Sequence, residues 1–144
     1  MKIKQLSLFL ENKPGHLSAI CRAMAKANVN IATLSLADTQ QFGILRLIVE
    51  DWEKARDVLE KAGFVVNATE VVATEVDDKP GGLAEILEIL EQGRINLEYM
   101  YAFSAHRGEK AILVLRFDDP DAAIALLAKN GRNVLTSVGL FQQS

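Results

Sequence analysis

The sequence predicts an α+β protein made of two βαββαβ units, each with an antiparallel sheet, packed together. Three observations lead to this prediction. Two of the three prolines stand in nearly the same phrase, at Pro14 and at Pro80. Apolar residues recur at helical spacing after each of them, and strand-like apolar runs flank both helices. The chain is therefore a repeat, although 144 residues is also a usual length for one domain.

The two copies align at an offset of 66 residues in their first halves. Between Lys13 and Ile31, six of nineteen positions are identical in the second copy, and the helix-stripe positions are apolar in both. Further along, the offset becomes 68, so the second copy carries two extra residues. We expect them in the polar loop at residues 106–108, because turns tolerate insertions. The predicted domains are residues 1–70 and 71–144.

Local signals order the elements of the first copy. Pro14 suits the start of a helix, Asp51 is a fitting N-cap for a second helix, and Gly63 ends that helix in a left-handed conformation. The run 44–49 is almost continuously apolar, which predicts a central strand. The expected strands are residues 3–10, 31–37, 44–49 and 64–69, with a turn at 40–41, and the expected helices run from Pro14 to Ala27 and from Asp51 to Lys61.

The second copy repeats the same order. Asp119 is its N-cap residue, and Pro120 takes the first helical position. The expected strands are residues 71–76, 97–103, 111–117 and 133–140, and the expected helices are residues 83–92 and 120–129. Two helices on one face of a four-stranded antiparallel sheet form the ferredoxin-like arrangement.

Composition and charge exclude several classes of protein. The chain is 49% hydrophobic and 24% charged, with no apolar run long enough for a membrane span or a signal peptide. We therefore expect a cytoplasmic protein without a membrane partner. One cysteine and two histidines predict no metal site and no cofactor. The net charge of −3, without a basic cluster, argues against a nucleic-acid partner.

A search for catalytic residues yields none. Cys21 lies between apolar residues on the helical stripe, so we expect a buried small side chain rather than a nucleophile. His106 stands in a polar loop and is expected to be a solvated surface residue. The carboxylate pairs at 50–51 and 118–119 precede helices, which N-capping explains. The sequence therefore predicts that the chain is not an enzyme.

The positive signal is the turn that carries Pro-Gly. The first amides of a helix have no internal partner, so the turn can hold a carboxylate or a phosphate. Gly15 and Gly81 would let a ligand approach the backbone closely. Alone, such a turn is usually only a turn, but here it is doubled, and an asparagine follows each proline by sixteen residues, at Asn30 and Asn96.

These phrases resemble the signature of the ACT domain, a small regulatory module of amino-acid metabolism. The resemblance rests on residues 11–17 with 28–31 and on residues 77–83 with 94–97. It covers essentially the whole chain, which is most similar to small stand-alone proteins made of two ACT domains. It implies a small ligand, usually an amino acid, bound at the interface between two ACT units near the Pro-Gly loops.

Ligand contacts follow from the resemblance residue by residue. In the serine-sensing ACT domain of phosphoglycerate dehydrogenase, the contacts match Asn12 and Asn30 in the first copy and Asp78 and Asn96 in the second. Asp78 departs from the asparagine pattern and should favour an ammonium group, so we expect two inequivalent sites. We also expect His16 to narrow the first loop and Gly82 to leave the second one open. The candidate ligand-binding residues are Asn12, Pro14, Gly15, His16, Leu17, Asn30, Ile31, Asp78, Pro80, Gly81, Gly82, Leu83, Asn96 and Leu97.

The sequence thus predicts a non-catalytic amino-acid-binding sensor or regulatory protein, which forms a homodimer and acts on a catalytic or signalling partner. One alternative is a protein-binding regulatory subunit, since residues 11–18 also resemble the small subunit of acetohydroxyacid synthase. A ferredoxin-like enzyme or RNA-binding protein is disfavoured. RNA binding of this fold needs basic and aromatic residues on the first and third strands, and residues 6–9 and 44–47 do not supply them.

Overall fold

The structure, a computed structural model, describes residues 1–11, 13–39 and 41–141. The chain divides into two compact units. Residues 4–69 form the N-terminal unit, and residues 70–144 together with residues 1–3 form the C-terminal unit. Within the described residues, no helix has both the length and the apolar character needed to cross a membrane.

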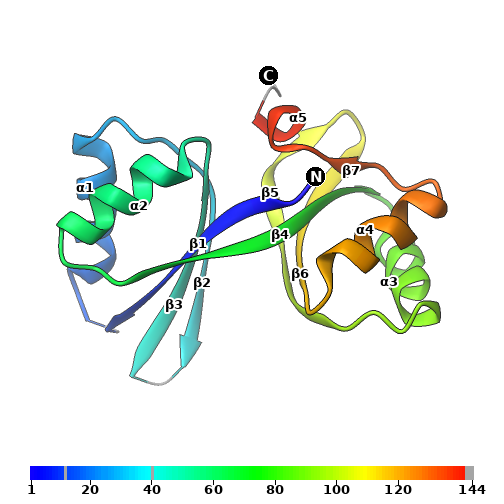
Figure 1. Cartoon of the computed structure of the whole chain (residues 1–144), viewed down its shortest axis with the longest axis horizontal. Coiled ribbons are helices and arrows are strands. Elements are labelled where there is room, and N and C mark those ends of the chain that lie inside the picture. The colour runs from blue at the N-terminus through cyan, green and yellow to red at the C-terminus, as the bar shows by residue number, and fades with distance from the viewer. Residues whose placement is uncertain (12, 40, 142–144) are drawn as a thin grey trace. The chain divides into compact units, whose positions relative to one another are not determined.

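In the N-terminal unit the strand order is β2-β3-β1-β4, and β3 pairs antiparallel with both β1 and β2. Figure 1 shows α1 and α2 side by side in this unit. The prediction of a central third strand is confirmed, because β3 lies between β2 and β1. The elements are β1 (Ile3–Glu11), α1 (His16–Lys26), β2 (Ile31–Thr39), β3 (Phe42–Val49), α2 (Trp52–Lys61) and the first residues of β4 (Val66–Asp77).

In the C-terminal unit, β4 pairs with β6 and with β7, and β6 pairs with β5, all antiparallel. Both units therefore contain the βαββαβ order, which confirms the predicted fold class. The predicted strands 64–69 and 71–76 are a single strand, since β4 runs through without a break. The remaining elements are α3 (Gly82–Gln92), β5 (Leu97–Arg107), β6 (Lys110–Phe117), α4 (Pro120–Lys129), β7 (Val134–Leu135) and α5 (Ser137–Phe141).

Each unit has its own apolar core between its helices and one face of its sheet. In the N-terminal unit Ile20 and Met24 of α1 and Leu59 of α2 are buried in one cluster with Leu45 and Leu47 of β3. Burying a side chain of this size contributes about 1.5–3 kcal/mol. The equivalent cluster of the C-terminal unit contains Ile86, Leu90, Leu113, Leu115, Phe117, Ala123 and Leu127.

The second helix of each unit begins at an aspartate cap, as predicted. The side chain of Asp51 accepts a hydrogen bond from the Lys54 amide at 3.2 Å, and that of Asp119 accepts one from the Ala122 amide at 3.1 Å. Gly63 has φ of +96°, which confirms the left-handed end of α2.

The predicted last strand, residues 133–140, is wrong beyond Leu135. Only Val134 and Leu135 pair with β4, and α5 follows at once. Thr136 causes the change, because its hydroxyl oxygen accepts the Gly139 amide at 3.0 Å and its carbonyl accepts the Leu140 amide at 2.8 Å. This is the pattern of a threonine that caps a helix.

The two extra residues of the second copy lie in a strand rather than in the predicted loop at 106–108. Ala102 of β5 pairs with Leu113 of β6, but His106 pairs with Ala111. Residues 103–105 therefore stand opposite one residue of β6, which is a bulge that inserts two residues into β5. The bulge lengthens β5 to 11 residues against nine in β2, whereas the partner strands β6 and β3 have eight residues each.

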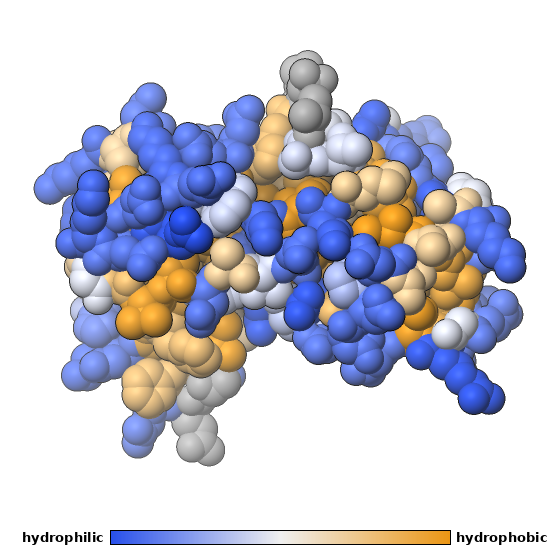
Figure 2. All heavy atoms as spheres, in the orientation of Figure 1, coloured by the Kyte–Doolittle hydropathy of each residue, from blue (hydrophilic) through white to orange (hydrophobic). Residues whose placement is uncertain are grey.

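The N-terminal unit exposes apolar side chains on its strands. Leu34 and Leu36 are 46% and 49% exposed on β2, which stands at one end of the strand order. Phe9 on β1 and Phe42 on β3 are 65% and 48% exposed. Figure 2 shows apolar surface in this part of the unit. Exposed apolar groups on an edge strand favour contact with another chain.

Asn28 and Arg94 occupy equivalent positions, but asparagine adopts the left-handed backbone conformation found there more easily than arginine. This difference leads to a prediction. Asn28 and Arg94 both follow the first helix of their copy with positive φ, of 57° and 55°. This conformation costs a residue with a Cβ roughly 1–2 kcal/mol, but asparagine tolerates it. We expect Arg94→Gly to raise the free energy of unfolding by about 0.5–1 kcal/mol, after the greater chain entropy of glycine is subtracted.

Urea denaturation followed by circular dichroism measures this change, and Asn28→Gly is the matched control. The control should gain less, because asparagine is already suited to the site. An equal gain in both variants, or a loss in Arg94→Gly, would contradict the explanation.

Candidate functional site

Two loops open the first helix of each copy through a left-handed glycine. Gly15 at the N-cap of α1 has φ of +94°, and Gly81 at the N-cap of α3 has φ of +87°. The helices begin one residue after these glycines, so the prolines precede the helices rather than lie inside them. Among the described residues no side chain caps α1 or α3, whereas aspartates cap α2 and α4. The first turns of α1 and α3 are therefore the ones that can accept an external group.

Space is available at both glycines. A Cβ atom added at Gly15 or at Gly81 would meet no described atom within 4 Å. The amide end of a helix carries a partial positive charge, which favours a carboxylate or phosphate oxygen. The geometry of both loops thus permits the backbone approach that the sequence predicts.

At the start of each loop, a carboxylate forms an ion pair with the lysine two residues later in the sequence. Lys13 lies 2.7 Å from the Glu11 carboxylate, and Lys79 lies 3.8 Å from the Asp77 carboxylate. The hydrogen bond and charge of Lys13 lower the pKa of Glu11 below its ordinary value. A hydrogen bond from Lys110, with the charges of Lys110, Lys79 and Arg132, lowers the pKa of Asp77. Both carboxylates therefore stay ionised at neutral pH.

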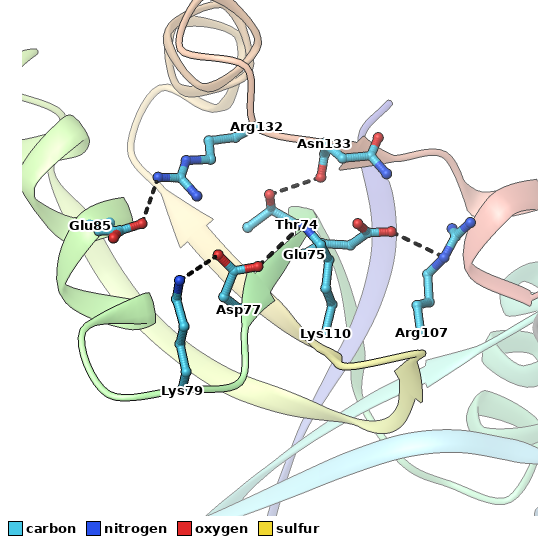
Figure 3. A network of polar contacts seen from close by, with 9 residues as sticks. All are labelled: Thr74, Glu75, Asp77, Lys79, Glu85, Arg107, Lys110, Arg132 and Asn133. Carbon is cyan, nitrogen blue, oxygen red and sulfur yellow. Dashed lines mark hydrogen bonds and ion pairs between the residues drawn. The ribbon is translucent and has the colours of Figure 1, made fainter.

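Side chains of other segments contact the residues at both ends of the second loop, and Figure 3 shows these contacts together. Lys110 of the hairpin lies 3.3 Å from Asp77, and Arg132 lies 3.1 Å from Glu85 on α3. The Asn133 carbonyl accepts the Thr74 hydroxyl at 2.9 Å. These contacts tie the end of β4 to the hairpin and tie α3 to the segment before β7.

The candidate asparagines lie far from the loop of their own copy. Glu11, which precedes the first loop, pairs with Phe42 at one end of β3, whereas Ile31, next to Asn30, pairs with Val49 at the other. Seven residue steps along β3 separate those ends, a distance of about 23 Å. The second copy repeats this separation, with Asp77 opposite Lys110 and Leu97 opposite Phe117. One amino acid cannot touch both groups of the same copy.

The candidate residues therefore fall into two groups in each copy. Asn30 and Asn96 are exposed, and Ile31 and Leu97 are half-buried and pack against the core of their unit. Asn12 lies outside the described residues, as does Gln40 of the predicted turn. The loop groups are Pro14, Gly15, His16 and Leu17 in the first copy and Asp78, Pro80, Gly81, Gly82 and Leu83 in the second.

The expectation that Gly82 leaves its loop open is wrong. Gly82 is buried, and a Cβ atom there would lie 2.0 Å from the Asp77 carbonyl oxygen. The Asp77 backbone occupies the space that a side chain at position 82 would need, so the second loop packs closely onto the end of β4. His16 occupies the equivalent place in the first copy, so the two loops cannot pack in the same way.

A polar hollow adjoins the second loop. We call it the second-loop hollow; it has a volume of about 520 Å³. Asp78 lies in it beside His106, with 3.4 Å between the carboxylate oxygen and Nε2. Its lining residues are Asp77, Asp78, Lys79, His106, Gly108, Glu109 and Lys110.

Sequence reasoning missed the role of the β5–β6 hairpin in this hollow. His106 is exposed, as expected of a solvated surface residue, but it lies in β5 rather than in a loop; its contact with Asp78 was not predicted, and Lys110 was not singled out. The signal available was the change of offset from 66 to 68, which marks the two residues that are inserted into this part of the second copy. The cross-strand pair of Asp77 and Lys110 then follows from antiparallel pairing.

The remaining expectations from the sequence concern Cys21 and possible metal ligands. Cys21 is half-buried rather than fully buried, as is its counterpart Leu87. Among the residues that the structure describes, no three histidine, cysteine, aspartate or glutamate side chains gather into a group that could hold a metal ion.

Comparison with known proteins identifies the repeat. A family model described as an ACT domain pair matches residues 1–141. Protein BT0572 from Bacteroides thetaiotaomicron is 38% identical, with a TM-score of 0.92 over 99% of this chain and 98% of that chain. A search of curated protein sequences gives no match.

More distant structures share the fold. The ligand-free regulatory subunit of aspartate kinase from Thermus thermophilus is 14% identical, with a TM-score of 0.63 over 88% of this chain and 91% of that chain. Aspartate kinase from Synechocystis is 21% identical, with a TM-score of 0.58 over 90% of this chain and 25% of that chain.

The packing at Gly82 leads to a prediction. Because a Cβ atom would collide with the Asp77 carbonyl, Gly82→Ala should lower the free energy of unfolding by about 1–3 kcal/mol, as overpacked sites do. His16→Ala, at the equivalent position, is the control and should cost less. Urea denaturation of both variants measures the difference. A stable Gly82→Ala variant would show that the second loop is not closely packed.

Proposed function

The chain belongs to the ACT domain family, as an ACT domain pair, and from this premise we propose that it is a non-catalytic regulatory protein that binds an amino acid. One observation carries the proposal: two helices open at left-handed glycines with open space beside them and without a side-chain cap among the described residues. An amino-acid carboxylate suits such a helix start.

The ammonium group needs an oxygen partner, and the asparagines and Asp78 offer one. The loop and the asparagine of one copy are separated by the length of a strand, so one ligand can use both only if they come from different ACT units. We therefore propose that each site is completed by a neighbouring ACT unit, as the family resemblance implies. A ligand that joins two units stabilises one arrangement of them, which is how binding would become a regulatory signal.

Thermal unfolding in the presence of each of the twenty amino acids tests this function. A ligand selective for the native state contributes about 2.7 kcal/mol at a hundred times its Kd. For a chain of this size, that corresponds to a rise in Tm of about 5–10 °C. Asn30→Ala and Asn96→Ala should each weaken binding at least tenfold in calorimetry, since each removes a hydrogen-bond partner.

Asn67→Ala, another exposed asparagine, is the matched control and should bind like the wild type. If millimolar concentrations of all twenty amino acids leave Tm unchanged, the amino-acid function is wrong.

The exposed apolar side chains favour a second candidate function, that of a protein-binding regulatory subunit. Leu34 and Leu36 lie on the edge strand β2 of the N-terminal unit. Such a strand suits pairing with another protein, either a catalytic partner or a second copy of this chain. Copurification with a catalytic protein, together with no amino-acid binding, would favour this candidate.

We propose a homodimer that uses this edge. Leu34→Lys with Leu36→Lys should convert a dimer to a monomer in light scattering, because two charges would be buried at the contact. Phe9→Lys is the control; Phe9 is also exposed but pairs with Ile44, on the other face of the sheet. A wild-type monomer, or a dimer that persists in the double variant, would contradict this proposal.

A further inference from the structure

The loop that opens α3 is attached to the β5–β6 hairpin where it leaves β4. The Asp78 amide donates a hydrogen bond to the Glu109 carbonyl at 3.3 Å. Next to it, Lys110 lies 3.3 Å from the Asp77 carboxylate, across the ladder between β4 and β6. One backbone contact and one side-chain contact therefore hold this end of the loop.

Arg132 holds the other end of the loop, where α3 begins. Its guanidinium donates a hydrogen bond at 3.1 Å to the carboxylate of Glu85, in the first turn of α3, as Figure 3 shows. The Arg132 side chain is 23% exposed and that of Glu85 49%. The Arg132 Nε is buried without a hydrogen-bond partner in the part of the chain that the structure describes. The guanidinium is thus packed into the fold, and Glu85 is the carboxylate that it binds.

Close backbone packing fixes the middle of the loop. Gly82 is buried, a Cβ atom there would lie 2.0 Å from the Asp77 carbonyl oxygen, and its amide donates to the Lys79 carbonyl at 3.0 Å. A Cβ atom at Gly81, in contrast, would meet no described atom within 4 Å. The loop is therefore packed against the strand on one side and open beside Gly81, as a preformed site must be.

The first copy lacks the side chains that make these ion pairs. Its residues at the equivalent positions carry no charge. They are Ala19 in place of Glu85, Phe42 in place of Lys110 and Phe64 in place of Arg132. Residue type alone therefore excludes both ion pairs in the first copy, and His16 in place of Gly82 excludes the same close packing.

We propose that Arg132 is a positioning residue, which holds Glu85 and so keeps the α3-opening loop in its binding conformation before a ligand arrives. The second site is then preformed, and it binds its amino acid more tightly than the site of the first copy. This inference rests on the proposed function, because it takes the helix-opening loops as ligand sites. It adds the order in which the two sites fill.

Preorganisation is the physical reason for the difference in affinity. When a loop becomes ordered only on binding, the cost of ordering it is subtracted from the binding free energy. Fixing the backbone of one residue costs about as much free energy as a tenfold change in Kd. The second site should therefore bind at least ten times more tightly than the first.

Hydrogen exchange of the ligand-free protein tests whether Arg132 holds the loop. In Arg132→Met the Gly82 amide should exchange at least tenfold faster than in the wild type, because the loop opens more often. Amides of β6 should keep their rates. Arg132→Lys keeps the charge and should restore most of the protection. Lys129→Met, which removes an exposed positive charge three residues away, is the matched control and should leave Gly82 unchanged.

Calorimetric titration with the twenty amino acids tests the order of affinity. The wild type should show two phases whose Kd values differ at least tenfold. Arg132→Met should weaken the tighter phase at least tenfold and leave the weaker phase unchanged, and Arg132→Lys should recover most of the loss. Glu85→Gln should weaken the same phase. Arg132→Met combined with Glu85→Gln should be no worse than Arg132→Met alone, because both residues act through one contact.

The outcomes separate this inference from the proposed function. Unchanged exchange at Gly82 in Arg132→Met, or losses of binding that add up in the double variant, would contradict the positioning role. Two equal sites, or a tight phase that Arg132→Met leaves intact, would overturn the order of affinity while the amino-acid function stands.

Two further results are also decisive. Circular dichroism checks folding, and if Arg132→Met does not fold, Glu85→Gln tests the same contact from the α3 side by exchange and by titration. If no amino acid binds the wild type, the proposed function fails and the order of affinity fails with it. The exchange rate of Gly82 then still decides whether Arg132 holds the loop.

Discussion

Each unit depends on two helices that bury an apolar stripe against one face of an antiparallel sheet. This packing requires the chain to leave a strand and reverse over the sheet within a few residues. Gly15 and Gly81 make the reversal possible, because a positive φ costs glycine nothing. The glycine takes the N-cap position, where serine, threonine or aspartate would otherwise supply a side-chain oxygen. The requirements of the fold thus produce the uncapped helix start that can receive a ligand.

The two copies share one backbone arrangement, but the side chains around their helix-opening loops differ. Glu11 and Asp77 occupy the same place, yet the residue across the ladder is Phe42 in one copy and Lys110 in the other. The lysine adds to the charge that stabilises ionised Asp77, while the aromatic ring beside Glu11 is partly exposed. At the helix start, His16 stands where Gly82 permits contact with the strand backbone. Two loops with one signature are therefore two different chemical environments.

Most of the fold could be predicted because its signals are local. Asp51, Asp119 and Gly63 act through their own turns, and the helix stripes show which face is buried. The errors arose where a single residue or a distant contact decides the outcome. Thr136 ends a strand that apolar sequence alone would continue. The site was harder to predict, because residues brought together by strand pairing, such as Asp78 and His106, leave no spacing pattern in the sequence.

The separation along each sheet also constrains how regulation can work. A loop that suits a carboxylate and an asparagine that suits an ammonium group lie at opposite ends of the same β-strand ladder. A single unit that presents only one of them binds a zwitterion weakly, since half of the ligand's charge stays without a partner. A site that combines groups from two ACT units binds more tightly, but only in the arrangement that aligns them. In the function proposed above, the free energy gained from the second group is the energy that favours that arrangement over others, so recognition of the ligand and control of the assembly would be one equilibrium.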